Sequence, residues 1–499
     1  MSDLITAFGL VLDPYVLAVI AASAAFGLFV GSIPGLTATM ATALLVPVTF
    51  FMDPVPAIAA IVTATAMAIF SGDIPGCLLR IPGTPASAAY ADEAFAMTRK
   101  GLAERALGTS LVFSVVGGLF GTTVLVLAAP VLAEFALSFS SFEYFWLVCL
   151  GLSCAVFISP ASPMKGLVSL FIGLLIATIG IDNPAGQPRF TFGHYELLTG
   201  VPFIPAMIGL FAVSEVMRAV VSNGLSLKPE AGAMTGILRG QGANLRRYWK
   251  QGLRGSVLGT AIGALPGAGA DIAAWIAYAL SKRFSKTPKK FGTGHEEGLA
   301  EAGAANNGAL SGAWIPALVF GIPGDSITAV VIGVLYVKGM NPGPTIFIHK
   351  PELIHAVFIV FFLANLILLP FGWAAIKLSK QALRVPQRVL MPLILMFCVV
   401  GAFAITNSMY GVVIALTLGV LGFFMEENGF PVAPAILGLV LGPMLEQNFI
   451  TSLIKADGSM LAFFERPIAG SLGVVTFAMW LLPLALWLYG WRRRAAQHT

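Results

Sequence analysis

Apolar runs long enough to cross a membrane recur along the whole of this sequence. A helix needs about 20 apolar residues to cross the hydrocarbon core of a bilayer. Lipid offers the backbone no hydrogen-bond partners, so such runs fold as helices, and we expect an all-α polytopic membrane protein. The predicted full spans are residues 106–133, 143–159, 163–180, 200–221, 353–376, 389–406, 409–425, 431–450 and 467–490.

Composition excludes the main alternatives. Charged residues make up 11% of the 499 residues and hydrophobic residues 57%, whereas a soluble protein carries about 25% charged residues. A soluble enzyme, a disordered chain and a nucleic-acid-binding protein are therefore excluded. The net charge of +5 comes from short basic clusters between apolar runs, so we expect contact with membrane lipid and none with nucleic acid.

The basic clusters predict the topology. Lys and Arg gather in short cytoplasmic loops, and the first basic residue is Arg80. We therefore predict that the N-terminus lies outside and that the C-terminus lies inside, in the cytoplasm. Glu296, Glu297 and Glu301 follow one cluster and are predicted to form a solvated cytoplasmic rim. The clusters placed inside are residues 99–105, 218–254, 282–290, 377–388 and 492–494.

Pro-Gly pairs interrupt the apolar sequence. Proline removes a backbone donor and glycine weakens a helix, so a break is expected at each pair. Residues 255–281 have basic clusters on both sides, which predicts a re-entrant hairpin that turns at its Pro-Gly pair. The four pairs are Pro34-Gly35, Pro82-Gly83, Pro266-Gly267 and Pro323-Gly324.

Three proline-containing motifs occur in the same order in both halves of the chain. The charge topology has the first copies entering from outside and the second from inside, which predicts two inverted repeats with broken helices, as in alternating-access transporters. The alternative is chance recurrence in a Gly- and Pro-rich membrane protein. The predicted parts are an N-terminal repeat (1–222), a cytoplasmic basic connector (223–254) and a C-terminal repeat (255–499). The matched segments are Gly31–Gly35 with Gly263–Gly267, Ile81–Thr84 with Ile322–Asp325, and Gly200–Leu210 with Gly429–Leu439.

The breaks predict a binding site for an anion. Unpaired backbone groups cost several kcal/mol each in hydrocarbon, so breaks are tolerated where they line a wet cavity. The N-terminus of a half-helix attracts anions, and the small hydroxyl residues after the breaks can donate hydrogen bonds without adding charge. The alternative is that the breaks are kinks and the hydroxyls bond to their own helices. The predicted substrate-binding residues are Pro34, Gly35, Thr37, Thr39, Gly83, Thr84, Ser87, Pro266, Gly267, Gly269, Asn306, Asn307, Pro323, Gly324, Ser326 and Thr328.

Acidic residues within apolar sequence predict a second site, for a coupling ion. Carboxylates inside a membrane are costly and usually serve ion or proton pathways. Asp271 and Asp325 follow two of the breaks, and Asn306 can add an amide oxygen. We predict that these residues hold Na⁺ or a proton. The alternative is that the two aspartates cap helices near the surface.

Other chemistry is not predicted. Arg80 abuts a break and either pairs with a substrate carboxylate or extends from a helix end toward water. The four cysteines and five histidines lack the spacing of metal ligands. The sequence also shows no nucleophile–base pair, so we expect no catalytic residue, no metal site, no enzyme activity, and no cofactor beyond a coupling Na⁺.

With these motifs in hand, the chain resembles the large membrane subunit of the tripartite tricarboxylate transporters. The resemblance covers about residues 15–490. At two places the sequence departs from the family pattern: Gly303 stands where the family commonly has an acidic residue, and Asp325-Ser326-Ile327 stands where it often has Ser-Pro-Thr. The segments that carry the resemblance are Gly31–Gly35, Ile81–Ala89, Leu265–Gly269, Phe291–Gly294, Glu297-Gly298, Ala304–Asn307 and Gly321–Gly324.

The resemblance implies a function and partners. It implies secondary-active uptake (symport) of a citrate-like di- or tricarboxylate across the bacterial cytoplasmic (inner) membrane, driven by a Na⁺ or proton gradient. The implied partners are a small four-helix membrane subunit and a periplasmic solute-binding protein. The alternative is a stand-alone organic-anion exchanger or channel with the same fold.

Overall fold

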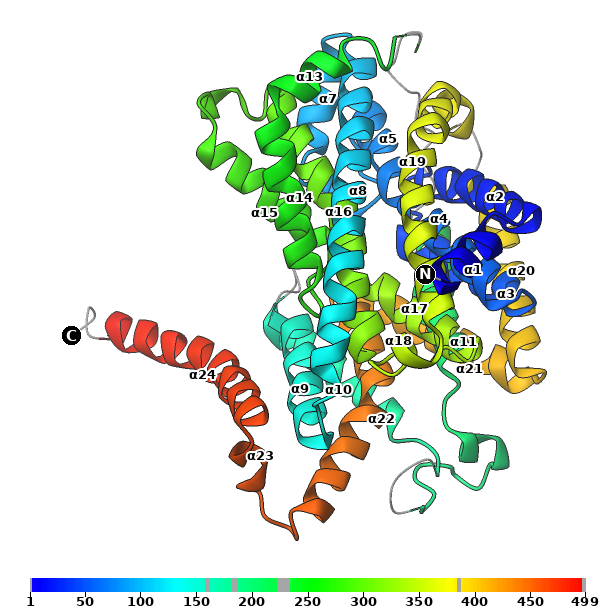
Figure 1. The fold of residues 1–499 in the computed structure, drawn as a ribbon, viewed down its shortest axis with the longest axis vertical. Helices are drawn as coiled ribbons and strands as arrows, with labels where there is room; N and C mark the ends of the chain where they lie inside the picture. Colours follow the sequence, from blue (N-terminus) through cyan, green and yellow to red (C-terminus); the bar gives the residue numbers. More distant parts are fainter. Residues whose placement is uncertain are drawn as a thin grey trace.

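The protein is a bundle of helices. The computed structural model describes residues 2–157, 162–181, 186–221, 234, 236–383 and 387–495. Within these ranges no β-strand forms beyond an isolated bridge between Gly180 and Arg189. Helices from both halves of the chain intermingle in one body, and the C-terminal α24 extends away from it (Figure 1).

The first half of the chain forms the helices up to α12. They are α1 (Ser2–Val11), α2 (Pro14–Gly31), α3 (Ala38–Phe50), α4 (Pro54–Ser71), α5 (Asp73–Leu79), α6 (Pro85–Ala88), α7 (Ala91–Arg99), α8 (Ala103–Ala136), α9 (Ser141–Phe157), α10 (Pro163–Ala177), η1 (Tyr195–Thr199), α11 (Phe203–Met207), the π-helix η2 (Ile208–Val213) and α12 (Ser214–Val221).

The second half forms the remaining helices. They are α13 (Gln241–Arg247), α14 (Trp249–Gly263), α15 (Gly269–Phe284), η3 (Pro288–Lys290), α16 (Glu296–Phe320), α17 (Ser326–Val337), α18 (Ile346–His349), α19 (Pro351–Ala382), α20 (Gln387–Thr406), α21 (Met409–Glu427), α22 (Val432–Lys455), α23 (Ala462–Glu465) and α24 (Pro467–Ala495).

Eight helical segments in the described ranges are long and apolar enough to cross a membrane. Six coincide with predicted runs, which confirms a multi-pass helical protein. The other two, Pro14–Gly31 and Pro54–Leu79, are not among the predicted full spans. The predicted runs 143–159, 163–180 and 467–490 overlap the shorter apolar segments Ser141–Cys154, Pro163–Ala177 and Pro467–Leu481, which are not among these eight.

The segment Pro54–Leu79 lies at the centre of the bundle. Every residue of α4 from Val55 to Ser71 is buried, and so is every residue of α16 from Glu296 to Val319. A helix that is buried on all sides has no solvent or lipid face. The prediction of a solvated rim at Glu296, Glu297 and Glu301 is therefore wrong, because other helices enclose this end of α16.

Glycines bring the neighbouring helices close to these two central ones. A Cβ atom at Gly27 or Gly31 of α2 would collide with the backbone of α4, and one at Gly259 or Gly263 of α14 would collide with the backbone of α16. Small residues at such crossings allow the close backbone approach that stabilises helix pairs in membranes. The two halves thus use the same packing device around their central helices.

Several helices pack against the opposite half of the chain. The first-half helix α3 contacts the second-half helix α17, and the second-half α15 contacts the first-half α6. In the same way α4 packs against α19, while α16 packs against α8. The contacts are exchanged between the halves, so neither half forms a separate globule.

The predicted helix breaks are present in the structure. Residues 32–37 separate α2 from α3, and residues 264–268 separate α14 from α15. Gly35 and Gly267 have positive φ angles of 91° and 80°, which an L side chain rarely adopts. The idea that each break starts a half-helix fails at Pro82-Gly83, because α6 has only four residues.

The basic connector predicted at 223–254 is described in part. Residues 223–233 and 235 lie outside the described residues, and α13 and the start of α14 occupy the rest. Glu301 on α16 binds Arg254 on α14 through two hydrogen bonds of 2.5 Å. This end of the connector is therefore joined to the central helix α16.

Candidate functional site

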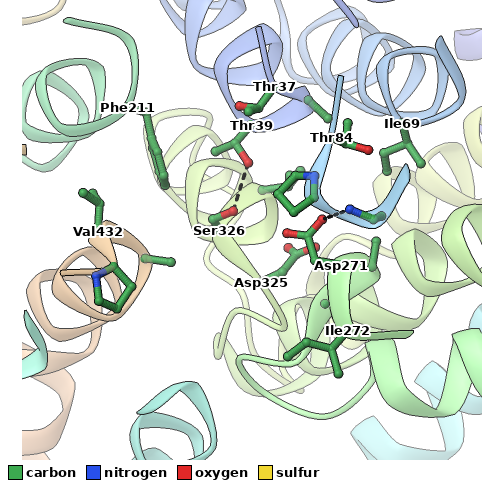
Figure 2. Close-up of a pocket in the computed structure, with 18 of the residues that line it drawn as sticks. Thr37, Thr39, Ile69, Thr84, Phe211, Asp271, Ile272, Asp325, Ser326 and Val432 are labelled. Carbon is green, nitrogen blue, oxygen red and sulfur yellow. Dashed lines mark hydrogen bonds between the residues drawn. The ribbon is translucent and has the colours of Figure 1, made fainter. Parts of the chain in front are cut away.

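The helix breaks of both halves meet around a cavity of about 630 Å³. Its walls come from the start of α3, the loop before α6, the π-helix and α12, the α14–α15 break, the start of α17 and the start of α22. Figure 2 shows side chains from α3, the π-helix, α15, α17 and α22 around one space. Residues nearly 400 positions apart in the sequence, such as Gly35 and Val432, share this cavity.

Most of the predicted site residues line this cavity. Those that do so are Gly35, Thr37, Thr39, Gly83, Thr84, Gly267, Gly269, Asp271, Asn306, Asp325 and Ser326. Those that lie outside its described lining are Pro34, Ser87, Pro266, Asn307, Pro323, Gly324 and Thr328.

Close backbone packing at the second break of each half supports the walls. A Cβ atom at Gly324 would lie 2.8 Å from the carbonyl oxygen of Gly263, and one at Gly83 would lie 2.8 Å from that of Gly31. The second break of each half thus packs on the end of the helix before the first break. Asn307 points to the other central helix, α4, where its Nδ2 donates to the Ala66 carbonyl at 3.3 Å.

Most of the predicted hydroxyl groups bond locally. The Thr37 side chain accepts from the backbone of Met40 and caps α3. Thr84 and Ser87 form a capping box at α6. Thr328 is the partner of Asp325 in a second capping box, at α17. These bonds follow the alternative interpretation, in which the hydroxyls bond to their own helices.

Thr39 and Ser326 behave differently. Their hydroxyl oxygens lie 2.9 Å apart, across the contact between α3 and α17 (Figure 2). Both residues line the cavity, so this hydrogen bond joins the two halves of the chain at its wall.

The two aspartates lie together at the cavity. Oδ1 of Asp271 accepts from the backbone N–H of Ala86 at 3.1 Å. Oδ1 of Asp325 accepts from the backbone N–H of Thr328 at 2.8 Å, so Asp325 is the N-cap of α17. The two carboxyl groups are close enough to interact electrostatically (Figure 2). Two like charges in one low-dielectric site favour binding of a cation or proton between them.

The N-terminus of α15 is a further polar element of the wall. Gly267, Ala268, Gly269 and Ala270 all line the cavity. The first N–H groups of a helix have no partners within the helix, and no described side chain caps α15. This end of α15 can therefore donate backbone hydrogen bonds to an anion.

A buried polar chain lies behind Asn306, and the sequence analysis missed it. Asn306 Nδ2 donates to the Tyr90 hydroxyl at 3.1 Å, and that hydroxyl donates to Asp73 at 2.6 Å. Ser110 donates to the other oxygen of Asp73. Asn306 Oδ1 is buried and has no hydrogen-bond partner among the described residues. The chain therefore orients the amide and leaves its oxygen available for a ligand.

A charged cluster on the cavity wall was also missed. Glu215, Arg218 and Glu426 line the cavity. Arg218 pairs with Glu426 and, at 3.5 Å, with Glu215. The signal in the sequence was the acidic and basic residues at the ends of the runs 200–221 and 409–425. Arg80, which was considered for a substrate contact, pairs with Asp92 and lies outside the described lining.

The fold and the cavity together define a class of protein. The cavity lies within a bundle of apolar helices, and interrupted helices from both halves form its walls. Irregular backbone at membrane depth around a polar cavity is typical of transporters that bind a solute between broken helices.

The comparison with known proteins identifies the family. The model of the tripartite tricarboxylate transporter TctA family matches residues 17–437, so the chain belongs to this family of transporters. It is the family of the large membrane subunit.

Two proteins of Agrobacterium vitis are similar to the chain. One, described as an "Uncharacterized 52.8 kDa protein in TAR-I ttuC' 3'region", is 34% identical over 92% of this chain and 91% of its own length. The other, an "Uncharacterized protein in TAR-II ttuC' 3'region", is 35% identical over 45% of this chain and 94% of its own length. No solved structure matches the chain.

Proposed function

We propose that this protein takes up a citrate-like di- or tricarboxylate across the bacterial cytoplasmic membrane by secondary active transport. The observation that carries the proposal is the convergence of helix breaks from both halves on one cavity. Backbone N–H groups at α15 supply donors for a carboxylate, and so does the hydroxyl of the Thr39–Ser326 pair whose hydrogen is not used in their mutual bond. Membership of the transporter family supports the substrate class.

Alternating access would use the two halves as inverted repeats. The exchanged contacts of α3 with α17 and of α15 with α6 support this arrangement. So does the matched close packing of Gly83 on Gly31 and of Gly324 on Gly263. Residues 1–222 and 255–499 would then be the two repeats, joined by the connector 223–254.

The coupling ion would bind at the aspartate pair. Among the described residues that line the cavity, four are acidic and one is basic: Glu215, Asp271, Asp325 and Glu426 against Arg218. A carboxylate substrate would be repelled unless a cation or proton entered with it. Asp271 and Asp325, with the oxygen of Asn306, are the groups that would hold Na⁺ or a proton.

The proposed partner proteins and membrane orientation are based on membership of the family. We propose that a periplasmic solute-binding protein delivers the carboxylate and that a small four-helix membrane subunit assembles with this chain. The N-terminus would lie in the periplasm and the C-terminus in the cytoplasm of a bacterial inner-membrane protein.

Uptake by proteoliposomes tests this function. The full chain is reconstituted with and without its small subunit and binding protein, and uptake of radiolabelled citrate, succinate and malate is measured under a Na⁺ or proton gradient. We expect uptake that requires both partners and stops when an ionophore removes the gradient. Uptake that persists without a gradient would refute coupling. Full transport by the chain alone would favour the alternative, an organic-anion exchanger or channel.

A further inference from the structure

Arg218 is the one basic side chain among the described residues that line the cavity. Its side chain is 39% exposed although two carboxylates contact it. The π-helix η2 immediately precedes α12 and contains Phe211, which also lines the cavity. π-Helical turns are rare and often occur at functional sites. The π-helical turn therefore directs the face of α12 that carries Arg218 toward the cavity.

The contacts of Arg218 leave donors for another anion. Both ion pairs, to Glu215 and to Glu426, are made by Nη2. A guanidinium has five N–H donors on three nitrogens, in a planar fork that fits a carboxylate. Arg218 can therefore bind a further carboxylate through nitrogens other than Nη2.

Arg218 is also close to the first helix break. A Cβ atom at Gly35 would lie 3.6 Å from Oε1 of Glu215, and Oε2 of Glu215 lies 3.5 Å from Arg218. The carboxylate of Glu215 thus lies between the Arg218 guanidinium and the break at Gly35. An anion that displaced this carboxylate would contact Arg218 and the break together.

We propose that Arg218 binds one carboxylate of the substrate, and that Glu426 and Glu215 compete with the substrate for this guanidinium. This inference rests on the proposed function and adds a substrate-binding residue to the cavity wall. The N-terminus of α15 lines the same cavity as Arg218, so a second carboxylate would have donors there, and we expect the cavity to prefer di- and tricarboxylates to monocarboxylates.

Competition predicts opposite changes in carboxylate affinity when the two partners of the Arg218–Glu426 ion pair are substituted. Arg218→Gln removes the guanidinium and should weaken carboxylate binding by about 30-fold, the usual size for a charged hydrogen bond. Glu426→Gln removes a competitor and should strengthen binding by about 3-fold or more. Arg218→Lys keeps the charge but loses the fork, so its affinity should fall between those of Arg218→Gln and the unchanged protein.

A matched control comes from a second ion pair. Arg189 binds Glu446 through two hydrogen bonds of 2.8 Å, and both residues lie outside the described cavity lining. The Glu446 carboxylate raises the pKa of Arg189, chiefly through hydrogen bonding, so the Arg189 guanidinium is charged. Arg189→Gln and Glu446→Gln should lower thermal stability alike and leave carboxylate binding unchanged.

The experiment measures binding to the full chain in lipid nanodiscs by calorimetry, with thermal unfolding alongside. The probes are citrate, tricarballylate, succinate and malate, with acetate as the monocarboxylate. Weaker binding by Arg218→Gln with tighter binding by Glu426→Gln would support the proposal. Equal weakening by both variants, or no change in either, would overturn it while leaving the proposed function standing. If the unchanged protein bound none of these acids, both proposals would fall.

Discussion

The first helix break of each half has the same backbone but different side-chain chemistry. Gly35 and Gly267 both have positive φ, and each precedes a helix that packs against the other half. Four residues after each glycine stand Thr39 in α3 and Asp271 in α15. Thr39 meets a hydroxyl across the contact, whereas Asp271 meets a backbone N–H and a second carboxyl group.

This difference suggests a division of labour between the two halves. The first break offers neutral hydroxyls and, close by, the guanidinium of Arg218. The second break offers two carboxyl groups beside the N-terminal N–H groups of α15, and Asn306 on α16 adds an amide oxygen. In the proposed function, a repeated backbone thus presents different chemical groups to one cavity, because the side chains of the two copies differ.

The largest expected effect tests whether the halves are packed alike. Gly83→Val and Gly324→Val each place a side chain against a backbone carbonyl that a Cβ atom would already approach to 2.8 Å. Each substitution should cost about 3 kcal/mol of stability, and the yield of monodisperse protein and the thermal midpoint should fall together.

Gly9→Val is the control for this pair, because a Cβ atom at Gly9 meets nothing within 4 Å. If one of the two valine variants were as stable as the Gly9 variant, the matched packing of the two halves would be refuted.

The next effect concerns the carboxyl groups. Asp271→Asn keeps the size of the side chain and removes its charge, so gradient-driven uptake should fall by about 100-fold or more. The dependence of the remaining uptake on Na⁺ or pH should change, which is measured in proteoliposomes. An unchanged number of cations per substrate would remove Asp271 from the coupling site.

A smaller effect is expected from alanine at the two breaks. Gly35→Ala and Gly267→Ala force a side chain into a left-handed backbone, at a cost of about 1–2 kcal/mol each. Substrate affinity should fall in both, because the strained backbone lines the cavity. Gly240→Ala carries the same strain at φ 80° away from the described lining, and unchanged transport is expected there. Equal losses in all three would show that strain alone is responsible.

The smallest effect concerns the amide of Asn306. Tyr90→Phe removes the hydroxyl that joins Asn306 to Asp73, so the amide loses its orientation. We expect the cation concentration for half-maximal uptake to rise by about 5-fold, equivalent to roughly 1 kcal/mol. Tyr278→Phe is the matched control, since its hydroxyl donates to Glu93 at 2.9 Å outside the described lining. A similar shift in both variants would argue against a role for Tyr90 at the cavity.

Some of the site could be predicted from the sequence and some could not. Pro-Gly pairs mark breaks through local sterics, so the breaks at Gly35 and Gly267 were predictable. The roles of the hydroxyls were not, because a local cap and a cavity contact need the same residue type. The cluster of Arg218 with Glu426 was also missed, since these residues lie about 200 positions apart.

The sequence by itself determined that this is a multi-pass helical protein, because lipid permits few ways to satisfy backbone hydrogen bonds. Hydrophobic length and helix-breaking residues act locally and can be read along the chain. Only the tertiary structure decided which groups surround the cavity and that Glu297 and Glu301 are buried. Such outcomes depend on which helices pack together, and that choice is made by the close fit of small residues such as Gly27 and Gly259 to distant backbones.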